Sequence, residues 1–302
     1  MTSAALTRLD GNSRAAARGW SDLSIRNLFI IPTIVFLIVF NIFPLIYSLG
    51  YSFTDYAAND QTREWSFVGL QNYRDLLSDP NIWSNFIITA KYVIVSVAGQ
   101  MIIGFGLALL LNRTFAFKGF LTTLLLLPMM MSAAVVGLFW QLLYSPNWGP
   151  INYVLGLGDF AWLSNPDSAL YAVAITDIWM WSPFVMLLSL AGLSAVPKHL
   201  YEAAAIDRAG TWYTFTRITL PLVSPLLLIA LIFRTMEAFK TFDIAYTMST
   251  QPTTELVSIR LYKMAFQQWD TGKSCALAYI VLIMVLAITN IYVKYLNRVK
   301  ER

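Results

Sequence analysis

Six apolar stretches of the chain are each long enough to cross a lipid bilayer, and this constrains the fold more than any other feature. A spanning helix needs about 20 consecutive, mostly apolar residues. Composition agrees, since hydrophobic residues make up 57% of the 302-residue chain and charged residues only 13%. Because backbone polar groups in lipid must find internal partners, the runs predict an all-α membrane protein with six transmembrane helices. The predicted spans are 28–53, 85–111, 120–144, 169–193, 222–248 and 274–296.

The distribution of Lys and Arg between the spans predicts how the chain crosses the membrane, because cytoplasmic loops carry an excess of these residues. If both termini are cytoplasmic, the inner segments hold thirteen Lys and Arg and the outer loops hold five. We therefore expect a cytoplasmic tail over residues 1–24, followed by one transmembrane domain over residues 25–302. The excess of basic residues, with a pI of about 9.1, is accounted for by these cytoplasmic segments, and no nucleic acid partner is needed to explain it. The five outer residues are Arg63, Arg74, Arg260, Lys263 and Lys273.

A polar insert at about residues 195–221 separates the fourth apolar run from the fifth. Its first half is rich in alanine, the strongest helix former, and Gly210 is expected to end that helix. We expect Thr211 to cap a second short helix, which carries Trp212 and Phe215 on one side. The residues alone leave two interpretations open: a loop that lies on the protein's own helix ends, or a docking surface for another protein.

The insert resembles the coupling loop of the permease subunits of binding-protein-dependent ABC importers. The family pattern runs Glu-Ala-Ala, two free positions, Asp-Gly-Ala, five free, Phe, two free, Ile, one free and Leu-Pro. One position differs from the family pattern, because Arg208 stands where the family usually has Gly. Gly210, two residues later, is expected to supply the backbone flexibility for the bend. By resemblance, the residues that couple to the ATPase are Glu202, Ala203, Ala204, Asp207, Arg208, Ala209, Gly210 and Phe215, and Ile218, Leu220 and Pro221 complete the match.

This resemblance covers nearly the whole chain after the tail and implies a type I ABC importer permease fold with a cytoplasmic coupling helix pair. It implies a multi-pass protein of the bacterial inner membrane that works with a second permease subunit, two ATPase subunits and an extracytoplasmic binding protein. ATP and Mg would bind the ATPase subunits, and neither an enzyme activity nor a cofactor is expected on this chain. The runs that flank the insert are most similar to the maltose and glycerol-phosphate branch. The cargo is therefore expected to be a sugar or sugar derivative, neutral or anionic.

Charged residues recur every three positions in the fifth apolar run. Arg234, Glu237, Lys240 and Asp243 alternate in sign, and Arg234 lies about 20 Å beyond Pro221, near the middle of the bilayer. Ionisable residues at such depth are costly and are candidates for function. One interpretation pairs Arg234 with Glu237 and Lys240 with Asp243 along the helix. We expect this gating or packing role for most of the four, and exposure to a polar pathway for Arg234.

The fourth apolar run carries a carboxylate one helical turn before an aromatic ring, at Asp177 and Trp181. This combination suits a sugar, because the carboxylate accepts hydroxyl protons while the ring covers C–H faces. The alternative is that Asp177 pairs with Arg234 or with Lys91. In the maltose-type importers that the chain resembles, cargo contacts lie on the helices just before and after the coupling loop. By position, the expected pathway residues are Asp177, Trp181, Arg234, Ala238 and Thr241.

The sequence offers no catalytic or metal-binding constellation. His199 is the only histidine and Cys275 the only cysteine, so a disulfide within the chain is impossible. The letters GKS at 272–274 would fit a phosphate loop only with glycine five residues earlier, where the chain has Gln267.

Two other functions stay open. A proton-coupled secondary transporter would also carry acids such as Asp177, Glu237 and Asp243 in the membrane, and would need no ATPase. That function does not account for the coupling-like insert. An ABC permease for another small solute, such as a peptide or an amino acid, would account for it.

Overall fold

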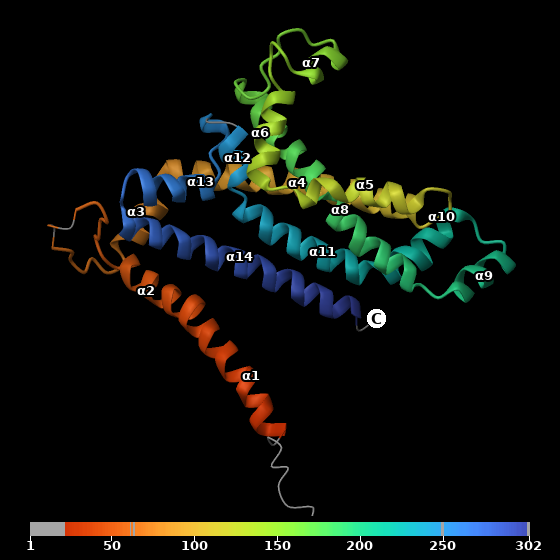
Figure 1. The fold of residues 1–302 in the computed structure, drawn as a ribbon, viewed down its shortest axis with the longest axis horizontal. Helices are drawn as coiled ribbons and strands as arrows, with labels where there is room; N and C mark the ends of the chain where they lie inside the picture. The colour runs from red at the N-terminus through yellow and green to blue at the C-terminus, as the bar shows by residue number, and fades with distance from the viewer. Residues whose placement is uncertain (1–21, 61, 63, 249–250, 301–302) are drawn as a thin grey trace, which may run out of the picture. The chain divides into compact units, whose positions relative to one another are not determined.

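The computed structural model describes residues 22–60, 62, 64–248 and 251–300, which are predominantly helical (Figure 1). Contacts divide the chain into two compact units, one up to Gly50 and one from Tyr51 onward. Within the described ranges, five helices are long and apolar enough to cross a membrane, or six if one bent pair counts as a single span. The predicted all-α membrane fold is therefore confirmed. Of the predicted tail, residues 1–21 lie outside the described residues.

The first unit is a long apolar helical segment. It consists of α1 (Asp22–Leu37), a π-helical turn (Ile38–Ile42) and α2 (Phe43–Ser52), which continues into the second unit. Pro44 lies in the first turn of α2, directly after the π-helical turn. A proline lacks the backbone N–H of a helical residue and crowds the carbonyl four residues earlier, and a π-helical turn accommodates such a break.

Two long helices form the centre of the second unit. They are α4 (Pro80–Leu111) and α8 (Pro166–Ala195), which pack along each other. Both begin with an Asx cap followed by proline: Asp79 Oδ1 accepts from Asn81 N at 2.9 Å, and Asn165 caps α8 in the same way. The caps explain why both helices start several residues before the predicted spans.

Gly104 allows these two helices to approach closely. A Cβ at this position would lie 2.6 Å from the backbone oxygen of Ser182, so only glycine fits there. Gly106 has no such role, because a Cβ there would have no neighbour within 4 Å.

Helices α11 (Leu220–Lys240) and α14 (Thr271–Lys300) complete the bundle. Helix α11 packs against α4, α8 and α14. The main core forms where α4, α8, α11 and their neighbours meet, and it includes Tyr92, Val97, Val173, Met180, Ala238 and Ile244.

The predicted third span is not one straight helix. It is broken into α5 (Lys118–Met130) and α6 (Ala133–Leu143), which meet at an angle of 99°. Met131 and Ser132 both adopt extended backbone conformations at the break, and Pro128 lies in the last turn before it. An apolar run predicts burial in lipid or protein but carries no information about such a change of direction.

The predicted fifth span also ends earlier than expected. Helix α11 stops at Lys240, Thr241 turns away from the helix, and a separate short helix, α12 (Asp243–Met248), packs against α6. The charges at the break suit both helix ends, since Lys240 lies in the last turn of α11 and Asp243 in the first turn of α12. Each charge complements the dipole of its own helix.

The remaining short elements lie between the long helices. The loop after the broken third span contains α7 (Pro150–Leu155). The others are α3 (Gln71–Ser78), α9 (Lys198–Ile206), α10 (Thr211–Thr214), a π-helical turn (Phe215–Thr219), a 3-10 turn (Pro252–Thr254), α13 (Val257–Tyr262) and a second π-helical turn (Lys263–Gln267).

Candidate functional site

Three buried polar side chains meet where α4, α8 and α11 touch. The Gln100 amide donates to Asp177 Oδ2 at 2.7 Å, and Gln100 Oε1 accepts from Arg234 Nε at 2.8 Å. The guanidinium of Arg234 also lies 3.6 Å from Asp177 Oδ2, and these two side chains are only 3% and 1% exposed. Gln100 thus bridges the ion pair and uses both ends of its amide to do so.

The pairing decides between the alternatives for Asp177 and Arg234. Arg234 pairs across helices with Asp177, as one of the alternatives for Asp177 had it, and the interpretation that pairs Arg234 with Glu237 along α11 is wrong. Lys91 lies at an exposed position of α4 and has no ion pair with Asp177 among the described residues. Gln100 was missed by the sequence analysis, although an amide in the middle of an apolar run is a signal for a buried hydrogen-bonding partner.

Trp181 completes this cluster. Its ring lies 4.5 Å from Arg234 Cζ, which is cation–π distance. The other carboxylate oxygen of Asp177, Oδ1, is buried without a hydrogen-bonding partner among the described residues. The hydroxyl of Tyr92, a buried neighbour of Asp177, also has no hydrogen-bonding partner among the described residues. A buried polar atom without a partner is costly, so a small shift that pairs this hydroxyl with Asp177 would be favourable.

A cavity of ≈ 160 Å³ opens beside the cluster. Of the five predicted pathway residues, four line this cavity. The exception is Ala238, which is fully buried in the main core. The lining residues are Ala133, Asp177, Trp181, Arg234, Glu237, Lys240, Thr241, Phe242, Asp243 and Ile244.

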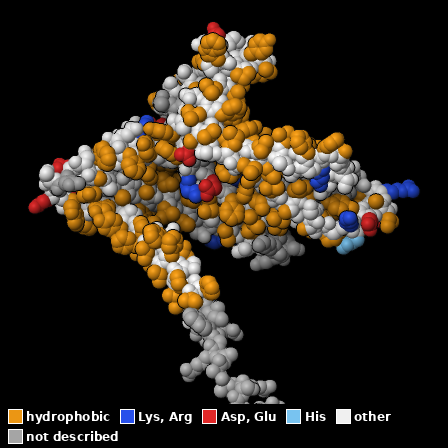
Figure 2. Space-filling view, viewed as in Figure 1, with side chains coloured by type: hydrophobic (Ala, Val, Ile, Leu, Met, Phe, Trp, Pro, Cys, Tyr) orange, Lys and Arg blue, Asp and Glu red, His pale blue; other side chains and the backbone are white. Residues whose placement is uncertain are grey.

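The three remaining charged residues of the predicted series surround the cavity mouth. Lys240 pairs with Glu237 at 2.7 Å, both more than half exposed, so the predicted Lys240–Asp243 pair is wrong. Figure 2 shows acidic and basic side chains gathered within an otherwise apolar face, in the region where Figure 1 places the end of α11. Three carboxylates and two cations line the cavity, so it carries no excess of positive charge.

The predicted coupling insert forms a bend at Arg208, after α9. Arg208 has a φ of 52°, the left-handed conformation that favours glycine. Ala209 N donates to Ala204 O at 2.8 Å and Arg208 N to Ala205 O at 3.1 Å, which is the hydrogen-bond pattern of a Schellman motif. Gly210 has φ −64° and ψ 153°, an extended conformation open to any residue. The expectation that Gly210 provides the bend is therefore wrong.

The second helix of the insert is not a separate short helix. Gly210 occupies the N-cap position, so Thr211 does not cap it. Helix α10, the π-helical turn and α11 follow one another as one continuous helical segment from Thr211 to Lys240. The coupling insert is thus joined directly to the helix that carries Arg234. The hydroxyls of Tyr201 and Thr219 lie 3.1 Å apart and connect α9 to the same helix.

The surface of the insert combines exposed charges with exposed apolar side chains. Glu202, Asp207 and Arg208 are exposed, whereas Ala204 is buried and holds α9 against the bundle. The Phe215 ring packs 6.1 Å from the Phe105 ring of α4. The remaining motif positions are Ala203 and Gly210, both exposed, and Ala209, half-buried. Ile206, Trp212 and Tyr213 are 82%, 75% and 60% exposed.

Long apolar helices around a buried ion pair, together with an amphipathic exposed insert, define a multi-pass membrane transport protein. The chain belongs to the family of binding-protein-dependent transport system inner membrane components, whose model matches residues 100–301.

The chain is similar to several transport permeases. It is 35% identical over 292 residues to the trehalose/maltose transport system permease protein MalF of Thermococcus litoralis, covering 94% of this chain and 97% of that one. It is 31% identical to the sulfoquinovosyl glycerol transport system permease protein SmoG of Agrobacterium fabrum, covering 97% of each chain. Among solved structures, a bacterial ABC transporter involved in the import of the acidic polysaccharide alginate matches with a TM-score of 0.79 at 21% identity, covering 91% of this chain and 95% of that one. The type I importer permease fold is confirmed.

Proposed function

We propose that the chain is the permease subunit of an ATP-driven importer and forms half of the translocation pathway for a neutral carbohydrate. The observation that carries this proposal is the cavity beside the Asp177–Gln100–Arg234 cluster. It is lined by a tryptophan ring, a carboxylate and a threonine hydroxyl, those of Trp181, Asp177 and Thr241. These groups stack on sugar C–H faces and bond sugar hydroxyls.

The relatives favour a sugar over a peptide or an amino acid. Their names refer to trehalose or maltose and to a sulfoquinovosyl glycerol, and the alginate importer has the same fold. These names cover both neutral and anionic carbohydrates. The charge of the cargo therefore has to be argued from the cavity itself.

The pairing of Arg234 supports a neutral cargo. Asp177 already compensates the guanidinium, and Gln100 occupies its Nε–H. An anionic cargo would have to draw Arg234 away from Asp177 and leave that carboxylate buried and unpaired. Breaking a buried pair in this way costs about 3–5 kcal/mol.

The proposed complex contains this chain, a second permease, two ATPase subunits that bind ATP and Mg, and an extracytoplasmic binding protein. Both termini and the 195–221 insert lie in the cytoplasm, as the distribution of Lys and Arg predicts. The exposed insert would dock on an ATPase subunit. Because its second helix continues as α11, movement of the insert would be transmitted directly to Arg234 and the cavity.

The test is uptake by the purified complex in liposomes, with trehalose, maltose and a digalacturonate as labelled cargo. We expect uptake of a neutral sugar that requires ATP and the ATPase subunits. Uptake driven by a proton gradient without the ATPase would show a secondary transporter instead. Preferential uptake of digalacturonate would contradict the neutral cargo.

The cavity is tested by Trp181→Leu. We expect uptake per assembled complex to fall about tenfold or more, since stacking and a cation–π contact are both removed. The matched control is Trp179→Leu, on the same helix but outside the cavity lining. An equal loss in both variants would show that the ring only stabilises the helix.

A further inference from the structure

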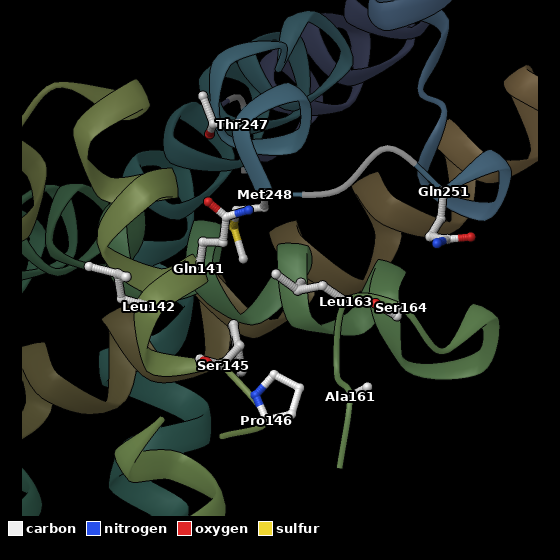
Figure 3. A pocket seen from close by; sticks show the side chains of 11 residues that line it. Gln141, Leu142, Ser145, Pro146, Ala161, Leu163, Ser164, Thr247, Met248 and Gln251 are labelled. Atoms are coloured by element: carbon white, nitrogen blue, oxygen red, sulfur yellow. The ribbon is translucent and has the colours of Figure 1, made fainter. Parts of the chain in front are cut away.

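A second cavity, of ≈ 410 Å³, lies at the opposite end of α12 from the candidate site. Figure 3 shows its walls, which come from the end of α6, the segment after α7, the end of α12 and Gln251. Its volume lies within the range of about 300–1,000 Å³ that is usual for small-molecule sites. We refer to it as the outer cavity, because the predicted topology places its loops outside.

The outer cavity is polar but uncharged. Within the described residues, the side chains of Gln141, Ser145 and Ser164 form no hydrogen bond with the protein. Gln141 and Ser164 are exposed and Ser145 is half-buried, so a ligand can reach all three. Leu142 and Leu163 add apolar surface. The polar residues that line the cavity are Gln141, Tyr144, Ser145, Ser164, Thr247 and Gln251.

Amides and hydroxyls both donate and accept hydrogen bonds, which matches the hydroxyls of a sugar. The absence of charged residues from the described lining gives no advantage to an anionic ligand. A neutral, hydroxyl-rich molecule is therefore the ligand class that this lining fits.

Helix α12 contributes to the lining of both cavities. Ile244 lines the cavity beside Arg234 and Thr247 lines the outer cavity, one turn later on α12. Between them, α12 presses against Gly137 of α6, where a Cβ would overlap Thr247 Oγ1. The six residues of α12 span only about 9 Å. Separation of α6 from α12 would therefore join the two cavities.

We propose that the outer cavity is an entry subsite, which holds a neutral, hydroxyl-rich unit of the cargo before α6 and α12 separate. This inference rests on the proposed function and adds a second binding position to it. Gln141 is the main polar contact, because its amide offers both a donor and an acceptor and has no intramolecular partner among the described residues (Figure 3).

The first test is protection of a cysteine. Ser164→Cys in a Cys275→Ser background places one thiol on the cavity wall, and a membrane-impermeant maleimide modifies it in the reconstituted complex. The probe is whichever of trehalose and maltose the wild-type complex imports better. We expect this sugar to slow modification at least about twofold, as occupancy of half the sites would, and digalacturonate to have no effect. The control, Asn147→Cys, lies on the same outer loop outside the cavity lining and is expected to react unchanged.

The second test is Gln141→Leu, with Gln268→Leu as the matched control at an exposed position outside the cavity. Loss of one hydrogen-bonding side chain is expected to lower maximal uptake about threefold to tenfold, with docking of the loaded binding protein unchanged.

Uptake at the wild-type rate, or no protection at residue 164, would overturn the entry subsite alone. Weakened docking in proportion to lost uptake would show that a segment of the binding protein occupies the cavity. Failure of the wild-type complex to import any sugar would overturn the proposed function as well.

Discussion

At the residue scale, Arg208 is the most unusual position of the insert. It takes a left-handed conformation that costs a non-glycine residue roughly 1–2 kcal/mol. The Schellman hydrogen bonds and the packing of Ala204 hold this conformation in place. The backbone at Arg208 thus forms the bend for which the family usually has glycine. The exposed Arg208 side chain adds a positive charge to the surface there.

Arg208→Gly is expected to be tolerated and to stabilise the complex by up to about 1 kcal/mol. Relief of the left-handed strain exceeds the cost of a more flexible unfolded chain, about 0.4–1 kcal/mol. Arg208→Val is the opposing variant and should destabilise, since a branched Cβ fits this conformation poorly. Thermal unfolding of the purified complex measures both. A lower melting temperature for the glycine variant than for the valine variant would show that the Arg208 side chain, not the backbone, dominates.

Arg234 gives the second prediction at this scale. Arg234→Ala leaves the Asp177 carboxylate buried without its cation, which costs about 3–5 kcal/mol, so less complex should assemble. The double variant Asp177→Asn with Arg234→Gln removes both charges and should recover much of the assembly. Measuring uptake per assembled complex distinguishes a structural role of Arg234 from a role in binding the cargo. Full assembly of Arg234→Ala with no uptake would mean that the guanidinium binds an anionic cargo.

At the element scale, the sequence predicted the straight helices well and the broken ones poorly. Helices α4, α8 and α14 follow their apolar runs, because length and hydropathy are enough to define a spanning helix. The breaks between α5 and α6 and between α11 and α12 occur inside apolar runs. They depend on packing between helices that are distant in sequence.

The same reason limits what could be predicted of the site. Asp177, Trp181, Arg234 and Thr241 were expected to line the pathway from their position on the helices beside the coupling loop, and they share one cavity. Their partner Gln100 lies 77 residues before Asp177 and 134 before Arg234. Spacing along one helix suggested Glu237 as the partner of Arg234, but that carboxylate is more than half exposed and pairs with Lys240.

Helix α9 carries the prediction on coupling. Glu202 is exposed and lies on the helix expected to dock on the ATPase. Glu202→Lys should leave assembly intact and abolish the stimulation of ATP hydrolysis by the loaded binding protein, together with uptake. The matched control is Glu64→Lys, at an exposed position of a predicted outer loop. Wild-type stimulation and uptake in Glu202→Lys would contradict the coupling role of α9.

The contact between α6 and α12 carries a further prediction. Gly137→Ala places a methyl group on Thr247 Oγ1 and should destabilise the complex by about 1–3 kcal/mol, as overpacking does. Gly106→Ala is the control, since a Cβ there meets no atom within 4 Å. It should be neutral or slightly stabilising, because alanine is the better helix former. Equal melting temperatures for the two variants would show that α6 and α12 are loosely packed.

At the scale of the whole molecule, the bent pair α5–α6 decides the topology. If the pair crosses the membrane, six crossings return the C-terminus to the side of the N-terminus. If it re-enters the side from which it came, there are five crossings, and the two termini lie on opposite sides. The asymmetry of Lys and Arg favours six crossings, because it places the basic insert and both termini inside.

This topology can be tested with single cysteines in the Cys275→Ser background, using an impermeant maleimide on cells stripped of the outer membrane. We expect Asp159→Cys to react and His199→Cys to react only after permeabilisation. Both positions are exposed, so burial does not limit either reaction.

The control is Thr114→Cys, just before α5. This position lies inside whether or not the pair α5–α6 crosses the membrane, so it should react only after permeabilisation. Reaction at residue 199 but not at residue 159 in intact cells would show that α5–α6 is a re-entrant loop. The insert would then lie outside the cell, where no ATPase could reach it. This result would also contradict the proposed coupling role of Glu202.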